Sequence, residues 1–146
     1  MGRFPLLTGV GLLALWLCGC ATVRPPPHTP PSVTRTLLTT GYCDCGECCG
    51  WRRTCLGIPV YTGGPLKGQR KQVGVTASGT RARRGTLAAD TTRYPFGTIM
   101  YIPDYGYGRV EDCGAAIKGD HIDLHFPSHR AAQKWGRRYA RVKVWY

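Results

Sequence analysis

The sequence predicts an all-β protein, a small closed barrel with one short helix near its C-terminus. Short apolar runs alternate with turn-forming residues along the chain, which contains Gly 20 and Pro 11. Only one segment, late in the chain, has the spacing of an amphipathic helix. At 146 residues, with no internal repeat, the chain is long enough for a single small domain with a modest core.

The expected strands follow one another at short intervals. They are residues 33–40, 58–62, 72–78, 85–90, 97–103, 108–112, 121–126 and 139–146. The segments "TGGP", "RARRG", "YPFG" and "PDYGYG" between them have turn chemistry. In the helical segment "PSHRAAQKWGRR", Ser128 can cap the first turn and Gly136 can end the helix. Closing the strands into a barrel would leave no exposed sheet edge.

The N-terminus predicts export and a lipid anchor. Residues 1–19 combine Arg3, an apolar run and small residues before Cys20, as in a bacterial lipoprotein signal peptide. We expect cleavage before Cys20, acylation of that cysteine, and an outer-membrane location in a diderm cell, because Ala21 is not Asp. A plain secretory signal or an uncut anchor is the alternative. Residues 20–32 are rich in proline and predict a semi-rigid tether ahead of a domain at 33–146.

The charge of the chain suggests an anionic partner. Lys+Arg 20 against Asp+Glu 8 gives a net charge of +12, which suits a polyanion or an anionic surface. Export argues against nucleic acid, and no RNA-binding motif is present. We therefore expect a cell-envelope protein, a monomer held at the membrane through Cys20, that does not bind nucleic acid.

The cysteines outside the leader are Cys43, Cys45, Cys48, Cys49, Cys55 and Cys113. In an exported chain, an even number of cysteines predicts disulfides first, here a stapled loop at "GYCDCGECCGW". The C-x-C-x-x-C-C spacing could also surround zinc, but no second cysteine pair or histidine follows at finger spacing. We therefore expect neither a metal nor a cofactor.

Acidic residues are concentrated in "EDCGAAIKGDHIDLHF", residues 111–126, which carries four of the 8 Asp and Glu. If "HIDLHF" is a strand, Asp123 points to the face opposite Ile122 and Leu124. A rigid strand with a polar face is where a working carboxylate would be held. Asp123 could instead be an ordinary solvated strand residue. A third reading makes His121, Asp123 and His125 a zinc site.

Several motifs together resemble the 3D domain, a family named for three aspartates. They are "LAAD" at 87–90, "GYGRVEDCGAAIKG" at 106–119 and "HIDLHF" at 121–126, with "VTASGT", "PFGT" and "AAQKWGRR" in matching order. The aspartates correspond to Asp90, Asp112 and Asp123. The family shares its fold with the catalytic domain of membrane-bound lytic transglycosylase A. The resemblance therefore implies a six-stranded double-psi β-barrel, preceded here by a cysteine-rich loop.

The resemblance also implies an activity on peptidoglycan. Such an enzyme cleaves the β-1,4 bond between N-acetylmuramic acid and N-acetylglucosamine and leaves a 1,6-anhydro product. Asp123 takes the position of the catalytic acid and base. Asp112 is expected either to tune Asp123 or to hold its own loop by backbone bonds, and Asp90 to bond backbone at a barrel turn. Thr80, Lys118 and Gly119 are the expected substrate contacts.

This chain departs from the family pattern in two respects. Cys55 and Cys113 stand where cysteines are not usual, which predicts a Cys55–Cys113 disulfide beside the site; alternatively, Cys113 replaces a small buried hydroxyl. From the length that remains after the predicted cleavage, we also expect no counterpart of the second domain that completes the groove of the transglycosylase. A non-catalytic, expansin-like binder of wall polysaccharide is therefore the rival function, with Trp51, Tyr61, Tyr101, Tyr105 and Tyr107 as candidate platforms.

Overall fold

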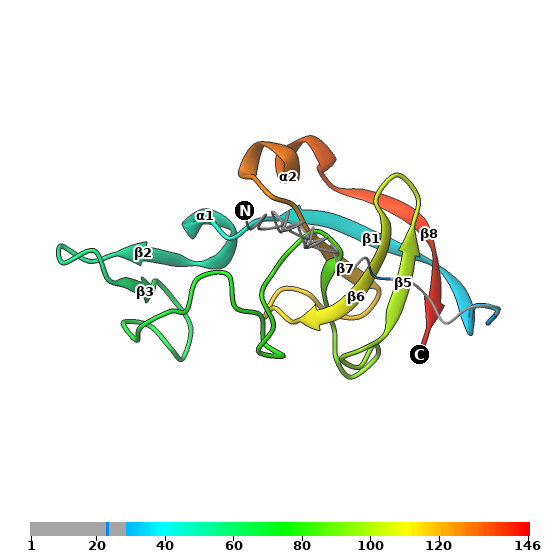
Figure 1. The fold of residues 1–146 in the computed structure, drawn as a ribbon, viewed down its shortest axis with the longest axis horizontal. Helices are drawn as coiled ribbons and strands as arrows, with labels where there is room; N and C mark the ends of the chain where they lie inside the picture. The colour runs from blue at the N-terminus through cyan, green and yellow to red at the C-terminus, as the bar shows by residue number, and fades with distance from the viewer. Residues whose placement is uncertain (1–22, 24–28) are drawn as a thin grey trace, which may run out of the picture.

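The computed structural model describes residue 23 and residues 29–146 and contains a closed barrel (Figure 1). The predicted signal peptide, Cys20 and most of the predicted tether lie outside the described residues. The strands of the barrel follow the order β1-β7-β4-β6-β5-β8. Their bounds are β1 Val33–Tyr42, β4 Thr86–Ala89, β5 Ile99–Ile102, β6 Gly106–Asp112, β7 His121–His125 and β8 Arg138–Trp145. This six-stranded barrel confirms the predicted fold class.

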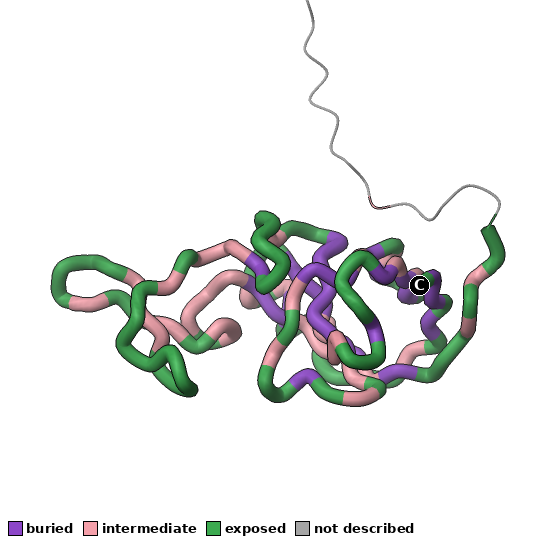
Figure 2. Tube along the Cα trace, turned by 90° about the horizontal axis from the view of Figure 1, so that it is seen from below, coloured by how far each residue is buried: buried purple, intermediate pink, exposed green. Residues whose placement is uncertain are grey.

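Pairing within the barrel mixes both directions. β1 pairs with β7 and β4 with β6 in parallel, whereas the remaining neighbours are antiparallel. Strands far apart in sequence are thus brought side by side, with β4 lying between β6 and β7. The core fills the barrel with alternate residues of these strands, including Leu37, Leu87, Val110, Ile122 and Val142, none of which is exposed to solvent. Figure 2 shows the buried residues gathered in this half of the molecule.

The helix α2, His129–Trp135, lies where the sequence predicts it. The Ser128 hydroxyl accepts a hydrogen bond from the Ala131 N–H at the N-terminus, and Gly136 ends the helix. α2 packs closely on β1: a Cβ added at Gly41 would lie 2.8 Å from the Ala132 carbonyl oxygen. Glycine at this position therefore allows the helix to rest on the barrel, close to the end of β1.

A second, two-stranded sheet projects from the barrel (Figure 1). It consists of β2, Trp51–Arg53, and β3, Pro59–Tyr61, and follows the one-turn helix α1, Gly46–Cys49. The sequence predicts only β3 among these elements. The predicted strand at 72–78 is wrong: Gly74 has φ +74°, and the segment folds back so that the Ala82 N–H donates to the Gly74 carbonyl. The alternating apolar residues of this segment therefore belong to a folded loop and not to a strand.

Within residue 23 and residues 29–146, no helix is long and apolar enough to cross a bilayer.

Candidate functional site

Asp112 and Asp123 lie in one row across the barrel wall. Ala88 in β4 is the register partner of Asp112 on one side and of Asp123 on the other. Paired residues on adjacent strands point to the same face, so all three side chains emerge together. Two strand spacings separate the aspartates, about 9.6 Å between Cα atoms. The small Ala88 side chain leaves the space between the two carboxyl groups open.

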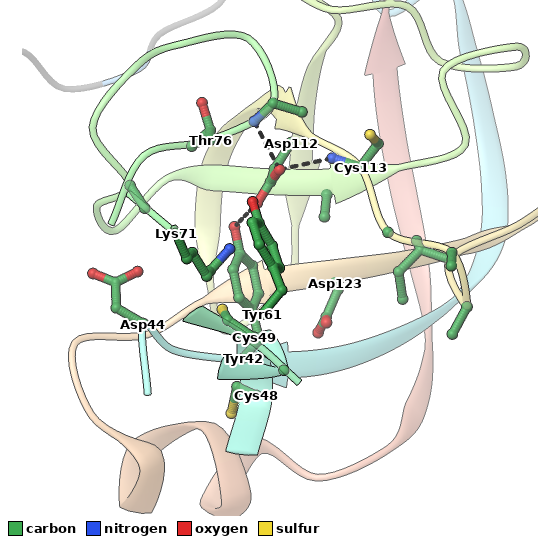
Figure 3. Close-up of a pocket in the computed structure, with 18 of the residues that line it drawn as sticks. Tyr42, Asp44, Cys48, Cys49, Tyr61, Lys71, Thr76, Asp112, Cys113 and Asp123 are labelled. Atoms are coloured by element: carbon green, nitrogen blue, oxygen red, sulfur yellow. Dashed lines mark hydrogen bonds between the residues drawn. The ribbon is translucent and has the colours of Figure 1, made fainter. Parts of the chain in front are cut away.

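These side chains face a groove of about 630 Å³ (Figure 3). One wall comes from the end of β1 and the cysteine-rich segment, including Tyr42 and Cys49, and another from the loop at 74–77. Tyr61 and Lys71 reach in from the projecting sheet and the residues that follow it. The groove is therefore built where the barrel and the projecting sheet meet, with carboxylates on its floor.

Asp123 is held by its neighbour on β1. Thr40 is its register partner, and the Thr40 hydroxyl donates a 2.9 Å hydrogen bond to Asp123 Oδ1. The same hydroxyl lies 2.9 Å from His121 Nε2. Because the hydroxyl has one proton and gives it to Asp123, His121 is the donor in the second bond. Oδ2 of Asp123 is left as the oxygen that can carry a proton toward the groove.

Burial changes the acidity of Asp123. The pKa of Asp123 is raised to about 6, mainly by loss of solvent and to a smaller extent by the Asp112 carboxylate, while the hydrogen bonds from Thr40 and the Leu124 backbone act in the opposite direction. Burial also lowers the pKa of His121, which favours the neutral imidazole beside Thr40. A substantial fraction of Asp123 therefore holds its proton in mildly acidic solution, as a general acid requires.

Asp112 accepts hydrogen bonds at both of its carboxylate oxygens. The Ala77 and Cys113 N–H groups donate to Oδ1, each at 2.9 Å, and the Tyr42 hydroxyl donates to Oδ2 at 3.3 Å. These bonds fasten the 74–80 loop to the end of β6. The three donors fix the position of the Asp112 side chain, so Asp112 presents its carboxyl group to the groove and also holds backbone.

Asp90 lies away from the residues that line the groove. Its carboxylate accepts hydrogen bonds from the Gly119 N–H at 2.9 Å and from the Thr92 hydroxyl at 2.7 Å. These bonds lower the pKa of Asp90, the Gly119 bond most strongly. Asp90 therefore ties the turn after β4 to the turn before β7. These contacts agree with the backbone-bonding role expected for Asp90, and a catalytic role for this third family aspartate stays untested.

The other predicted site residues contact the groove less directly. Thr80 and Lys118 are exposed and, like Gly119, do not line the groove. The Thr80 hydroxyl bonds that of Thr76, which does line it. The other two acidic residues of the 111–126 segment accept hydrogen bonds away from the groove. The Thr86 hydroxyl donates to Glu111, and the Tyr94 hydroxyl donates to Asp120. Substrate contact by Thr80, Lys118 and Gly119 remains a prediction.

Sequence reasoning missed Lys71 and Tyr42 as groove residues. The Lys71 ammonium lies 4.5 Å from the centroid of the Tyr61 ring. Tyr61 belonged to the proposed aromatic platforms, but Tyr105 is a buried core residue and Trp51 lies outside the groove. Nothing in the local sequence marks Lys71 among the 20 Lys and Arg, because the fold alone brings it beside the carboxylates.

All six cysteines among residues 29–146 are free thiols in the structure. Cys55 and Cys113 are both exposed free thiols. The expected Cys55–Cys113 disulfide stays a prediction. Cys43, Cys45 and Cys48 instead gather around His129, with all four ligand atoms within 4.8 Å of one another. The strand reading of His121, Asp123 and His125 as a metal site fails, because His121 contacts Thr40 while the buried His125 contacts Asp44.

The fold and the groove define a small β-barrel with a protonatable carboxyl group between open walls. Residues 85–146 match the family model of the 3D domain, which confirms the resemblance read from the sequence. The match covers β4 to the C-terminus and includes Asp90, Asp112 and Asp123.

Two curated proteins of Bacillus subtilis (strain 168) are similar to this chain over 75 residues. YabE, named as a cell wall shaping protein, is 33% identical, and YocH, named as a cell wall-binding protein, is 37% identical. The alignments cover 49% of this chain but only 18% of YabE and 26% of YocH. This chain thus corresponds to a minor part of each relative.

Solved structures of MltA from E. coli also show similarity. One is 27% identical with a TM-score of 0.40, over 48% of this chain and 26% of that one. The form with bound chitohexaose is 26% identical with a TM-score of 0.43, over 52% and 28%.

Proposed function

We propose that this protein acts on the bacterial cell wall as a peptidoglycan lytic transglycosylase. The single observation that carries the proposal is Asp123, a partly buried carboxyl group with its pKa raised to about 6 on the floor of an open groove. The 3D-domain match over residues 85–146 and the cell-wall names of YabE and YocH support the same assignment. The substrate would be the glycan strand, cut at the bond between N-acetylmuramic acid and N-acetylglucosamine.

The proposed reaction needs one carboxyl group used twice. Protonated Asp123 gives its proton to the glycosidic oxygen as the bond from the muramic C1 breaks, and the leaving sugar departs as an alcohol. The carboxylate then takes the proton from the 6-hydroxyl of the muramic residue as that oxygen bonds to C1. The 1,6-anhydro ring closes, Asp123 regains its proton, and no water is consumed.

Asp112 would act through its charge in this scheme. Its hydrogen bonds with Ala77, Cys113 and Tyr42 fix its carboxyl group in the groove, so it suits stabilisation of positive charge at the sugar carbon. Thr40 would act as a positioning residue: it fixes Oδ1 of Asp123 and leaves Oδ2 for the substrate.

Lys71 and Tyr61 would recognise the substrate at the groove wall. An ammonium group beside an aromatic ring offers a cationic contact and a flat apolar surface together. The stem peptides attached to the muramic residues carry free carboxyl groups that Lys71 could bind, and the face of a sugar ring can stack on Tyr61. Lys71 and Tyr61 would act in addition to the predicted contacts at Thr80, Lys118 and Gly119.

The rival function is binding of wall polysaccharide without cleavage. The name of YocH, a cell wall-binding protein, favours it, as does the open form of the groove. Under this reading, Tyr61 and Lys71 hold the glycan, and Asp123 is only one polar contact among several.

The test compares the purified protein with its Asp123→Asn variant on isolated peptidoglycan. Mass spectrometry should detect 1,6-anhydro muropeptides from the parent and none from the variant, with both proteins still sedimenting with the wall. Reducing-end products would indicate hydrolysis, with Asp112 as a second catalytic group. If both proteins bind and neither releases products, the rival function is correct.

The location in the envelope is also a proposal. Export, cleavage before Cys20 and acylation of that thiol would hold a basic domain against the wall and, in a diderm cell, at the outer membrane. Intact-mass analysis of the protein extracted from membranes should show the diacylglyceryl addition and its loss in Cys20→Ser. An unmodified N-terminus at residue 1 would contradict the anchor.

A further inference from the structure

We propose that Cys43, Cys45, Cys48 and His129 form a structural zinc site that fixes one wall of the groove. The three cysteines come from the end of β1 and from α1, and His129 opens α2 more than 80 positions later in the chain. This inference does not depend on the proposed catalytic activity. It concerns a tetrad that sequence spacing could not reveal, because its histidine lies outside any finger-like interval.

The spacing of the ligand atoms fits a tetrahedral metal. Two sulfurs bound to zinc at about 2.3 Å lie about 3.8 Å apart, and a sulfur and an imidazole nitrogen about 3.6 Å apart. In this protein Cys43 Sγ and Cys48 Sγ are 3.8 Å apart. His129 Nδ1 lies 3.4 Å from Cys45 Sγ and 3.4 Å from Cys48 Sγ. A disulfide would need its sulfurs at about 2.05 Å, so these thiols are arranged around a centre and not in pairs.

Neighbouring groups orient the ligands as they do in established zinc sites. His129 Nε2 lies 3.0 Å from Glu47 Oε2, so the carboxylate holds the ring with Nδ1 free to bind metal. The Cys48 N–H donates to Cys45 Sγ at 3.5 Å, which supports a thiolate there. Three thiolates and one imidazole in tetrahedral array select zinc over the harder ions that prefer oxygen.

Cys49 marks the limit of the cluster. Its thiol donates to the Cys43 carbonyl at 3.2 Å and lines the groove, so it is turned away from the other three sulfurs. Cys55 lies exposed beyond β2. These two cysteines therefore serve as internal controls, because they differ from the ligands in position and not in chemistry.

The site would clamp the base of the projecting sheet to the barrel. It joins the 43–48 segment to α2, which itself rests on β1 through Gly41. Asp44, within that segment, accepts from the Trp51 indole at 2.9 Å and contacts His125 at 3.1 Å. Tyr42, Cys48 and Cys49 line the groove next to these ligands. With four protein ligands the site is closed, so it supports the wall and has no open position for catalysis.

The test measures metal on the full-length protein purified under reducing conditions without chelator. Inductively coupled plasma mass spectrometry should find one zinc per chain, and Co²⁺ in its place should give thiolate-to-cobalt charge transfer and tetrahedral d–d bands. His129→Ala and Cys45→Ser should lose both signals, whereas Cys49→Ser and Cys55→Ser should keep them. Glu47→Gln should weaken zinc binding about tenfold.

Limited trypsin digestion separates loss of the clamp from loss of the fold. The side chains of Arg52, Arg53, Lys67 and Arg70 are already exposed. Removal of zinc should loosen the backbone of the projecting sheet and its loop and speed cleavage at these residues, while the barrel strands stay protected. The proposal is overturned if the reduced protein binds no zinc, if peptide mapping finds a disulfide among Cys43, Cys45 and Cys48, or if zinc binding survives His129→Ala.

Discussion

Replacing Asp123 by asparagine should make the folded protein more stable near neutral pH. The native carboxyl group holds its proton up to about pH 6, whereas the same group releases it near 3.8 when exposed. Between these values the native state binds more protons than the unfolded state, so the parent loses stability as the pH rises from about 4 to 6. Asparagine cannot ionise, and its carbonyl can still accept the Thr40 hydrogen bond.

The gain in unfolding free energy follows from the difference between the pKa of Asp123 in the native state and its pKa in the unfolded state. A difference of about 2 pKa units corresponds to about 3 kcal/mol at pH 7, which is a rise of about 10 °C in Tm for a domain of this size. The gain should vanish at pH 3, where Asp123 is protonated in both states. Cleavage of peptidoglycan should be abolished at every pH, so stability and activity change in opposite directions.

The assay is urea unfolding of parent and variant at pH 3, 5 and 7, followed by tryptophan fluorescence. Asp104→Asn is the matched control, because it removes the same charge from a side chain that is 77% exposed. A stability difference between parent and Asp123→Asn that does not change with pH would refute the buried, proton-holding Asp123. So would a variant less stable than the parent at pH 7.

Three further predictions follow from the same contacts. Cleavage rates should fall about tenfold per pH unit above about pH 6, as Asp123 loses the proton it must donate; a flat profile to pH 8 would exclude it as the acid. Ala88→Leu should fill the gap between Asp112 and Asp123 and lower kcat/KM about 100-fold with both carboxylates intact, whereas Ala88→Gly should keep most activity. Tyr105→Phe should cost about 3 kcal/mol in chemical unfolding, because the buried hydroxyl bonds both the His125 carbonyl and the Gly85 N–H; a loss below about 1 kcal/mol would mean that water replaces it.

Local patterns in the sequence predicted most elements of the barrel correctly. The alternation in "HIDLHF" places Ile122 and Leu124 in the core and Asp123 toward the groove, as found. The predicted N-cap at Ser128 and helix end at Gly136 correctly gave the bounds of α2. The same reasoning failed at 72–78, where turns at Gly74 and Gly79 override an apolar alternation. The alternation also does not show that His125 is buried, which results from contacts with Asp44 and Tyr42 at that end of β7.

What the sequence determined by itself is the set of barrel strands and the helix α2, because strand alternation, helix caps and turn residues act over a few positions. Motif order likewise determined the family resemblance. Only the tertiary structure decided which of the acids share a groove: β4 lies between β6 and β7 and makes Ala88 the partner of both Asp112 and Asp123. It also brought His129 to the cysteines and Lys71 to the carboxylates. Such contacts depend on barrel closure between distant segments, which no local pattern encodes.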